Sequence, residues 1–110
     1  YDTFDCVSPT RIARHGIMLS RVNSKGINLN NSKFKNDHSL LDDECELSEI
    51  NNFTKSYLHH LFKSNEILGI VILSLYNIWF MNKFFEDIRT NIQSDTFEKF
   101  KKNFFDNLTK

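Results

Sequence analysis

The residues of this chain with the clearest chemical potential lie within its first sixteen positions. Apolar and polar residues alternate at the start of the chain, over residues 1–4, and the carboxylate of Asp5 follows. A Pro-Thr pair at positions 9 and 10 then precedes two arginines, Arg11 and Arg14. A carboxylate can act as a nucleophile, and a guanidinium binds phosphate through paired hydrogen bonds. Both kinds of side chain belong where a barrel strand meets its loop, because that rim faces the substrate.

Asp5 is the sharpest candidate for a catalytic residue. A carboxylate can attack an electron-poor carbon and form a covalent intermediate with it. The alternative interpretation is an aspartate that caps the turn at the end of a strand. Asp2 lies an odd number of residues away, so on a regular strand the two carboxylates would face opposite sides and form a poor acid/base pair.

Short β-prone runs surround these residues. Residues 2–7 alternate as a strand, and Pro9 falls in the loop that follows, where a missing N–H does least harm. Residues 16–22 and 26–30 are two further runs joined by residues 23–25 and closed by a glycine, which predicts a hairpin. Residues 31–49 are polar and predict an irregular segment with a turn of helix near 32–36.

The pattern becomes helical from about Ile50. One helix is expected through Phe62, because apolar residues repeat at spacings of three and four. A second is expected over about 65–92 with Ser64 as its N-cap, and a third from Asp95 with Glu98 as capping-box partner. The first half of the second helix is apolar on nearly every side, so we expect it to be enclosed on several faces. Alone, these helices would expose a large apolar surface that requires a partner, either the rest of a barrel or another chain.

Length and composition bound the class of protein. With 110 residues the chain holds one domain at most, whereas a (β/α)8 barrel needs roughly 250. It begins at Tyr1, which we interpret as a fragment or one half of a split protein. The apolar run over residues 67–80 is interrupted by Ser74 and Asn77 and is shorter than the ~20 residues that span a bilayer, so a buried helix and no membrane are expected. Two cysteines and no secretory signal favour a reducing, cytoplasmic location.

Charge is unevenly distributed although the net charge is zero. Residues 6–36 contain arginines and lysines but no acidic residue, and residues 37–49 contain aspartates and glutamates but no lysine or arginine. A basic segment beside an acidic one fits a nucleic-acid-binding edge next to a separate lobe. The alternative is two solvated loops of opposite sign.

The opening segment closely resembles the signature of the tRNA-guanine transglycosylases. The matching residues are Phe4, Asp5, Cys6, Val7, Pro9, Thr10, Arg11 and Arg14. These enzymes exchange the guanine at the wobble position of a tRNA anticodon for a deazaguanine (preQ1 or queuine), a step of queuosine biosynthesis. The resemblance implies that Asp5 is the nucleophile that holds a covalent aspartyl-ribosyl intermediate. It also implies that the general acid/base and the base-recognition residues lie in a part of the barrel outside this chain.

The resemblance extends to an RNA contact. Thr10, Arg11, Ile12, Ala13 and Arg14 match the family segment that contacts the anticodon loop of tRNA. Guanidinium groups bind phosphate and stack on unpaired bases, so RNA loops favour arginine over lysine. The alternative is a surface loop with ordinary arginines.

The zinc site of the family is degenerate in this chain. In the family, a Cys-x-Cys-x-x-Cys run and a distant histidine of a His-Asn pair hold the ion. The register set by residues 41–45 and 56–69 keeps Cys45 and places the other ligand positions on Leu47, Ile50 and Tyr76. Because a structural zinc site needs four nitrogen or sulfur ligands, we expect no zinc and no other cofactor. The three replacements are expected to pack together as a hydrophobic plug.

The remaining chemistry-bearing residues have structural interpretations. His59 and His60 are adjacent, point about 100° apart on a helix, and match family histidines that are not the zinc ligand. His15 and His38 have no partner at a metal-ligand spacing. Cys6 is expected to be a buried packing thiol.

The chain therefore resembles the C-terminal portion of a tRNA-guanine transglycosylase with an α/β fold. We expect the last barrel strand and the RNA-contact loop over 1–14, an inserted degenerate zinc subdomain with a hairpin over 15–60, and the final barrel helix with a C-terminal cap over 61–110. Expected partners are tRNA, the deazaguanine base, and the missing N-terminal barrel portion or a homodimer partner. The fragment alone is expected to be inactive. Two alternatives stay open: a non-catalytic remnant or RNA-binding subunit, and an unrelated helical module that matches by accident.

Overall fold

One long helix, α4, organises the structure. The computed structural model describes residues 6–21, 25–42 and 45–107. In chain order the elements are α1 (Ser8–Ala13), β1 (Ile17–Met18), β2 (Ile27–Asn28), the 3₁₀ turn η1 (Ser32–Phe34), α2 (Ser48–Asn51), α3 (Lys55–Lys63), α4 (Ile67–Gln93) and α5 (Phe97–Asn107). The described part is mostly helical with a small two-stranded antiparallel sheet, and it is elongated, 46 × 26 × 25 Å. The predicted helical character after residue 50 is confirmed.

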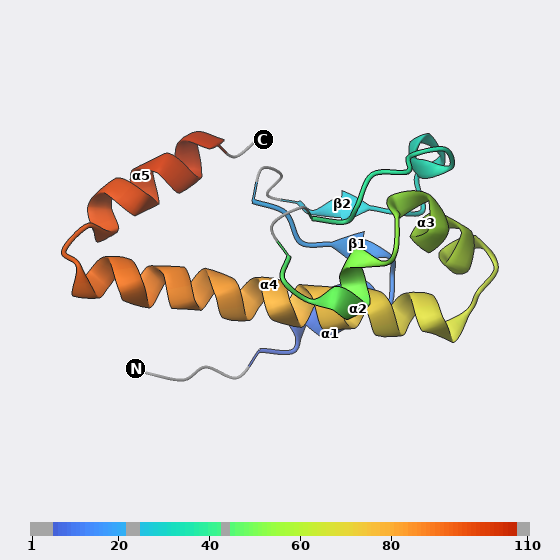
Figure 1. The fold of residues 1–110 in the computed structure, drawn as a ribbon, viewed down its shortest axis with the longest axis horizontal. Coiled ribbons are helices and arrows are strands. Elements are labelled where there is room, and N and C mark those ends of the chain that lie inside the picture. Colours follow the sequence, from blue (N-terminus) through green and yellow to red (C-terminus); the bar gives the residue numbers. More distant parts are fainter. Residues whose placement is uncertain (1–5, 22–24, 43–44, 108–110) are drawn as a thin grey trace.

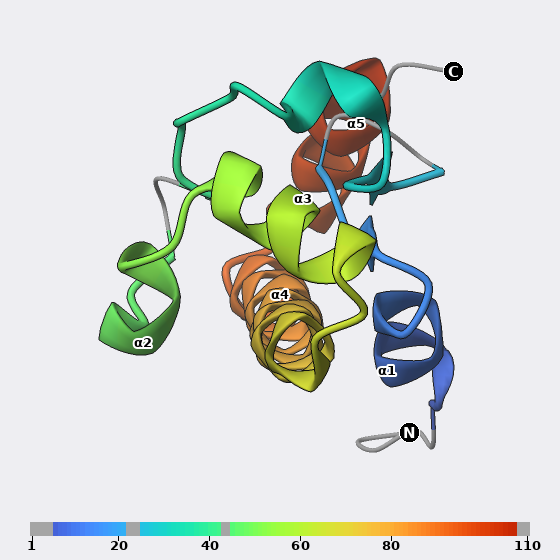
Figure 2. The same cartoon turned by 90° about the vertical axis from the view of Figure 1, so that its right-hand side faces the viewer.

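The other elements cover α4 on some sides only. Viewed down α4, α1 and α2 lie on opposite sides of it and α3 crosses a third side (Figure 2). At the far end of α4 the chain turns back, and α5 lies beside the last turns (Figure 1). The Phe84 and Phe104 rings, with centroids 5.1 Å apart, join α5 to α4.

The segment after the expected barrel strand is a helix and not the predicted loop. Pro9 stands in the first turn of α1, where its fixed φ suits a helix start and its missing N–H would have had no intrahelical partner. Pro9 and Ala13, four residues apart, are buried against α4. The expected strand over 2–7 is not tested, because residues 1–5 lie outside the described residues and residues 6–7 have no regular structure.

The predicted hairpin is confirmed, but it is shorter than expected. Ile17 pairs with Asn28 and Met18 with Ile27, in antiparallel register. The connection therefore covers residues 19–26 and not only the three predicted residues, of which 23 and 24 lie outside the described residues. The predicted turn of helix after the hairpin is confirmed as η1.

Two predicted helix starts are wrong, for the same physical reason. Ser64 is the C-cap of α3 and not the N-cap of α4, and Asn65 follows it with φ 56°. Asp95 has φ 59° and follows Ser94, the C-cap of α4, so α5 begins only at Phe97. In both turns the N–H two residues after the C-cap bonds back to the last helical turn: Glu66 to Leu61 (2.9 Å) and Thr96 to Asn91 (2.8 Å). This is the Schellman motif, which requires a left-handed residue that Asn and Asp tolerate.

A third boundary also differs from the prediction. The single helix expected from Ile50 to Phe62 is divided into α2 and α3. The break occurs because the Thr54 side chain accepts a hydrogen bond from the Tyr57 backbone N–H (3.2 Å) and so caps a new helix.

The core lies on one face of α4. Its buried positions recur at spacings of one, three and four: Gly69, Ile72, Leu73, Tyr76, Asn77 and Phe80. The opposite side carries large apolar residues that are exposed, including Ile67 (75 %), Val71 (55 %) and Ile78 (43 %). The expected enclosure is therefore present on the sides where α1, α2 and α3 lie, and the expected large apolar surface is present on the remaining side. No described element covers that side in Figure 2.

α4 is longer than the apolar run in the sequence, because it continues through polar residues to Gln93. By length and composition alone it qualifies as a helix able to cross a membrane, with 33 % of its most apolar window buried. The sequence-based argument that the run is too short is therefore not decisive. A single such helix is weak evidence, since core helices pass the same test.

Tyr76 is a buried polar group at the centre of this core. Its hydroxyl donates a hydrogen bond to the Asp42 carboxylate (3.0 Å) and lies 3.5 Å from the Leu19 carbonyl oxygen. The residue is 1 % exposed. Burial and the neighbouring Asp42 carboxylate raise the pKa of the Tyr76 phenol well above its usual value near 10.

Alkaline pH should therefore destabilise the fold partly through Tyr76. The folded state holds the phenol proton more tightly than the unfolded state does. The contribution of Tyr76 to the free energy of unfolding is therefore complete below pH 10 and is lost as the pH rises above that value. We expect the unfolding free energy of the wild type to fall more steeply above pH 10 than that of Tyr76→Phe, measured by urea unfolding. Tyr57→Phe, at a 39 % exposed site, is the matched control and should keep the wild-type slope. Equal slopes for Tyr76→Phe and the wild type would contradict this.

Candidate functional site

The helix α1 presents the two arginines of the opening segment on one side. Arg11 and Arg14 are three residues apart, so they are neighbours on the helix surface, and both are exposed. Pro9 and Ala13 occupy the opposite, buried side. Of the other predicted RNA-contact residues, Thr10 and Ile12 are half-buried, and the fully buried Ala13 offers no side-chain surface to a partner. The predicted edge is thus a narrow pair of guanidinium groups on a short helix.

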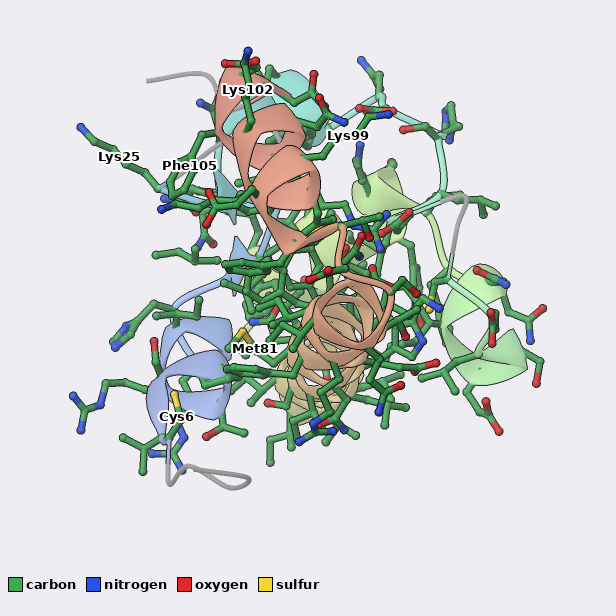
Figure 3. The ribbon with its side chains drawn as sticks, turned by 90° about the vertical axis from the view of Figure 1, so that its left-hand side faces the viewer. Cys6, Lys25, Met81, Lys99, Lys102 and Phe105 are labelled. Carbon is green, nitrogen blue, oxygen red and sulfur yellow. The ribbon has the colours of Figure 1, made fainter. Side chains whose placement is uncertain are left out.

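The predicted nucleophile lies next to this edge in sequence, but Asp5 and Asp2 are outside the described residues. The described chain begins at Cys6, which is exposed and whose side chain lies beside α1 (Figure 3). The expectation of a buried packing thiol is wrong. Residues 6 and 7 precede the first turn of α1 and have no regular structure that would enclose their side chains.

A tight turn fixes how α1 leads into the hairpin. Gly16 has φ +79°, and a Cβ atom there would lie 2.5 Å from Asn30 Nδ2. That nitrogen donates a hydrogen bond to the His15 carbonyl (3.0 Å), and the Leu29 N–H bonds to the Gly16 carbonyl (2.8 Å). Only glycine combines this backbone conformation with so close an approach. His15 itself is exposed beside Arg14.

A single polar side chain, Asn77 of α4, reaches both sides of this turn. It is completely buried, and its amide bonds to the Pro9 and Ile17 carbonyls and to the Leu19 N–H, each at 3.0 Å. Sequence reasoning treated Asn77 as an interruption of an apolar run and as the residue after the predicted ligand position at Tyr76. Its position among core-facing apolar residues could have indicated a buried side chain that bonds to other segments, because a buried amide must find hydrogen-bond partners.

The four positions that match the family's zinc ligands lie together in the core. Cys45, Ile50 and Tyr76 are buried members of the hydrophobic core, and Leu47 packs against that core, which agrees with the predicted hydrophobic plug. Burial raises the pKa of the Cys45 thiol, and a protonated thiol is a poor metal ligand. Within residues 6–21, 25–42 and 45–107, no three His, Cys, Asp or Glu side chains gather as a metal site. The residues present do not fit a tetrahedral zinc ion.

The histidines considered as replacement ligands serve other contacts. His59 is 7 % exposed, and its Nδ1 lies 2.7 Å from the Leu29 carbonyl, which can only accept, so this nitrogen carries the proton. The bond ties α3 to the end of β2. His60 and His38 are exposed, at a surface distinct from the buried Cys45.

Comparison with known proteins identifies relatives along the whole chain. The family model for queuine tRNA-ribosyltransferase matches residues 1–110. Queuine tRNA-ribosyltransferase of Dehalococcoides mccartyi (strain CBDB1) is 41 % identical over 103 residues, which cover 94 % of this chain and 26 % of the relative. The Thermoanaerobacter sp. (strain X514) protein is 42 % identical over 105 residues, 94 % of this chain and 27 % of the relative. The Prochlorococcus marinus (strain MIT 9215) protein is 41 % identical over 97 residues, 88 % of this chain and 26 % of the relative.

These matches overturn the alternative of an accidental resemblance. They are carried by most of the chain and not only by the opening motif. The chain spans about a quarter of the length of the relatives it matches. With a family model matched over all 110 residues, the chain belongs to the queuine tRNA-ribosyltransferase family.

Proposed function

We propose that the complete protein of which this chain is a part exchanges the wobble guanine of a tRNA anticodon for a deazaguanine, preQ1 or queuine, in queuosine biosynthesis. The observation that carries the proposal is the family match over residues 1–110 together with the opening motif around Asp5. A reaction on cytoplasmic tRNA also agrees with the sparse use of cysteine.

Asp5 is the proposed nucleophile. Its carboxylate attacks C1′ of the target nucleoside, the bond from C1′ to the guanine nitrogen breaks, and guanine leaves with a proton from a general acid outside this chain. The incoming deazaguanine then gives up a proton and attacks C1′, which releases the Asp5 carboxylate. Two displacements through a covalent intermediate retain the configuration at C1′. Because the acid/base group and the base pocket are not part of this chain, the fragment alone is expected to be inactive.

The proposed fold of the complete protein is a (β/α)8 barrel, with the last strand over residues 2–7, a degenerate zinc subdomain within 15–60, and a final helix and cap over 61–110. The exposed apolar side of α4 supports this proposal. Ile67, Val71 and Ile78 are large side chains with 43–75 % of their surface exposed, in a chain that covers about a quarter of its relatives. Burying them against the preceding part of the protein would remove an apolar surface of the kind that normally marks an interface.

The exposed pair Arg11 and Arg14 is the proposed contact with the anticodon loop, together with the neighbouring Thr10 and Ile12. Two guanidinium groups one helical turn apart can engage successive phosphates or stack on unpaired bases. Neither arginine is buried, so an approaching RNA meets both without rearrangement of the core.

The proposed subdomain needs no zinc. The Tyr76–Asp42 hydrogen bond and the burial of Cys45, Leu47 and Ile50 occupy the region that a metal would brace in the family. A homodimer that depends on a zinc-braced subdomain is correspondingly in question for this protein.

A second function is favoured by the same loss of ligands. If the complete protein has lost catalysis as well as zinc, Arg11 and Arg14 would still bind RNA, and the protein would be a non-catalytic binding subunit or remnant. The covalent test below separates this alternative from the enzyme.

The role of Asp5 is tested by trapping. The complete protein, given tRNA and a deazaguanine inhibitor, should form an adduct that survives denaturing electrophoresis. Asp5→Asn should abolish it, because an amide is a poor nucleophile, while Asp2→Asn should leave it intact. An undiminished adduct in Asp5→Asn would rule out the assignment, and no adduct in the wild type would favour the non-catalytic alternative.

The arginine edge is tested by salt-dependent binding. Arg11→Gln and Arg14→Gln should each weaken binding of an anticodon stem-loop and lower the slope of log affinity against log salt concentration by about one. Arg89→Gln, an exposed arginine near the C-terminal end of α4, is the charge-matched control and should change little. The same loss in all three variants would indicate a general charge effect and contradict a specific edge.

Metal content tests the zinc-free core. Elemental analysis of the purified protein should find substoichiometric zinc, and a chelator should leave the melting temperature unchanged. Combining Leu47→Cys, Ile50→Cys and Tyr76→His restores the family ligand types and should create chelator sensitivity, since structural zinc adds directly to folding stability. Stoichiometric zinc in the unmodified protein would contradict the proposal.

A further inference from the structure

We infer that Asn77 is a positioning residue that holds α1 and β1 against α4 and so sets where Arg11 and Arg14 lie. The consequence for activity rests on the proposed function. We call the three hydrogen bonds from the completely buried Asn77 side chain to Pro9, Ile17 and Leu19 the Asn77 clamp, and the clamp does not depend on the proposed function.

The Asn77 amide is fully satisfied by backbone groups of distant segments. Its Nδ2 has two N–H groups, which donate to the Pro9 and Ile17 carbonyls at 3.0 Å each. Its Oδ1 accepts from the Leu19 N–H, also at 3.0 Å. These partners are 58 to 68 residues away in the sequence, so the bonds determine tertiary placement and not the local conformation of α4.

Asn77 takes the place of a neighbouring strand at the free edge of β1. The N–H and C=O groups of successive strand residues point to alternate sides. The Gly16 carbonyl bonds to the Leu29 N–H on the β2 side (2.8 Å), so residues 17 and 19 direct their groups the other way. On that side the Asn77 amide accepts a hydrogen bond from the Leu19 N–H and donates one to the Ile17 carbonyl. These backbone groups would otherwise be unpaired inside the core.

The same nitrogen fixes the two ends of the arginine segment. Pro9 lies in the first turn of α1 and Ile17 is the first residue of β1, and Arg11 and Arg14 stand between them. The rigid Gly16 turn joins α1 to β1 within this span. One planar amide therefore sets both the distance and the rotation of α1 relative to the hairpin.

The contacts of Asp42 and of α1 with α4 differ from those of the Asn77 amide. Asp42 accepts the Tyr76 hydroxyl on the adjoining part of α4, and Arg11 and Arg14 point to solvent. Pro9 and Ala13 make apolar contact with α4, which resists separation but leaves α1 able to slide or rotate. Hydrogen bonds with defined direction are needed to fix the register.

Asn77→Leu tests the inference because it keeps the branched shape and the number of side-chain heavy atoms and removes all three bonds. Asn77→Asp keeps the shape and an acceptor but removes both donors. The matched control is Asn91→Leu, because Asn91 lies on the same helix and its side chain bonds to Asp87 and Thr96, in a part of α4 that does not include Asn77. All variants of the complete protein are compared well below their melting temperatures, where circular dichroism shows each to be folded.

Amide hydrogen exchange measures directly whether the Leu19 N–H is hydrogen-bonded to Asn77. In Asn77→Leu, the Leu19 amide should lose its protection while the Leu29 amide, which bonds to Gly16, keeps it. The rate of tRNA adduct formation per folded molecule should fall about 100-fold in both Asn77 variants, since a displacement near 1 Å at a reacting group has that effect. The Asn91→Leu control should match the wild type in both measurements.

Each outcome separates this inference from the proposed function. Retained protection of Leu19 in Asn77→Leu, or an adduct rate equal to that of the wild type, would overturn the positioning role. If the wild type itself forms no adduct, the proposed function fails, and the Leu19 amide alone decides whether Asn77 is the clamp.

Discussion

Helix α4 places a tyrosine hydroxyl and an asparagine amide side by side within its buried face, and the rest of the fold is arranged around their partners. An unpaired polar group in a core costs about 1–3 kcal/mol, so each of these groups must be satisfied by another segment. Tyr76 is satisfied by Asp42, which brings the segment before α2 to one side of the helix. Asn77 is satisfied by Pro9, Ile17 and Leu19, which brings α1 and β1 to the other. Two adjacent residues, Tyr76 and Asn77, thus hold the segments on the two opposite sides of α4, where α2 and α1 lie in Figure 2.

This buried face of α4 also holds the segment that contains Cys45, Leu47 and Ile50, three of the four positions of the predicted degenerate zinc site. Cys45 and Ile50 lie in the same cluster as Tyr76, and Leu47 packs against it, so burial braces residues 45–51 against α4 at the positions that the proposed loss of zinc would otherwise leave without a brace. The replacement differs physically from a metal site. Zinc adds a large directional contribution that a chelator removes, whereas an apolar cluster with one phenol–carboxylate bond responds to core substitutions and to alkaline pH.

The sequence predicted the elements better than their boundaries. The periodicity of apolar residues identified the helices after residue 50 and the hairpin, because burial of one face leaves a repeat in the sequence. It failed where a turn depends on backbone conformation: Ser64 and Asp95 look like helix starts, but the left-handed residues Asn65 and Asp95 instead follow the C-caps Ser64 and Ser94. It also missed the helix at residues 8–13 and the exposure of Cys6, since both depend on what surrounds that segment. At the candidate site, residue types identified Arg11 and Arg14, but the hydrogen bonds of Asn77 join residues nearly 70 positions apart and have no local signal.

The most direct test of the central claim, that this chain carries the nucleophile of a tRNA base exchange, is to locate the covalent bond. The complete protein is trapped on tRNA with a deazaguanine inhibitor and digested with nuclease and trypsin, and the peptide that ends at Arg11 is sequenced by tandem mass spectrometry. The account predicts a ribosyl mass increment on Asp5. An increment on any other residue, or an adduct confined to a peptide outside this segment, would contradict it.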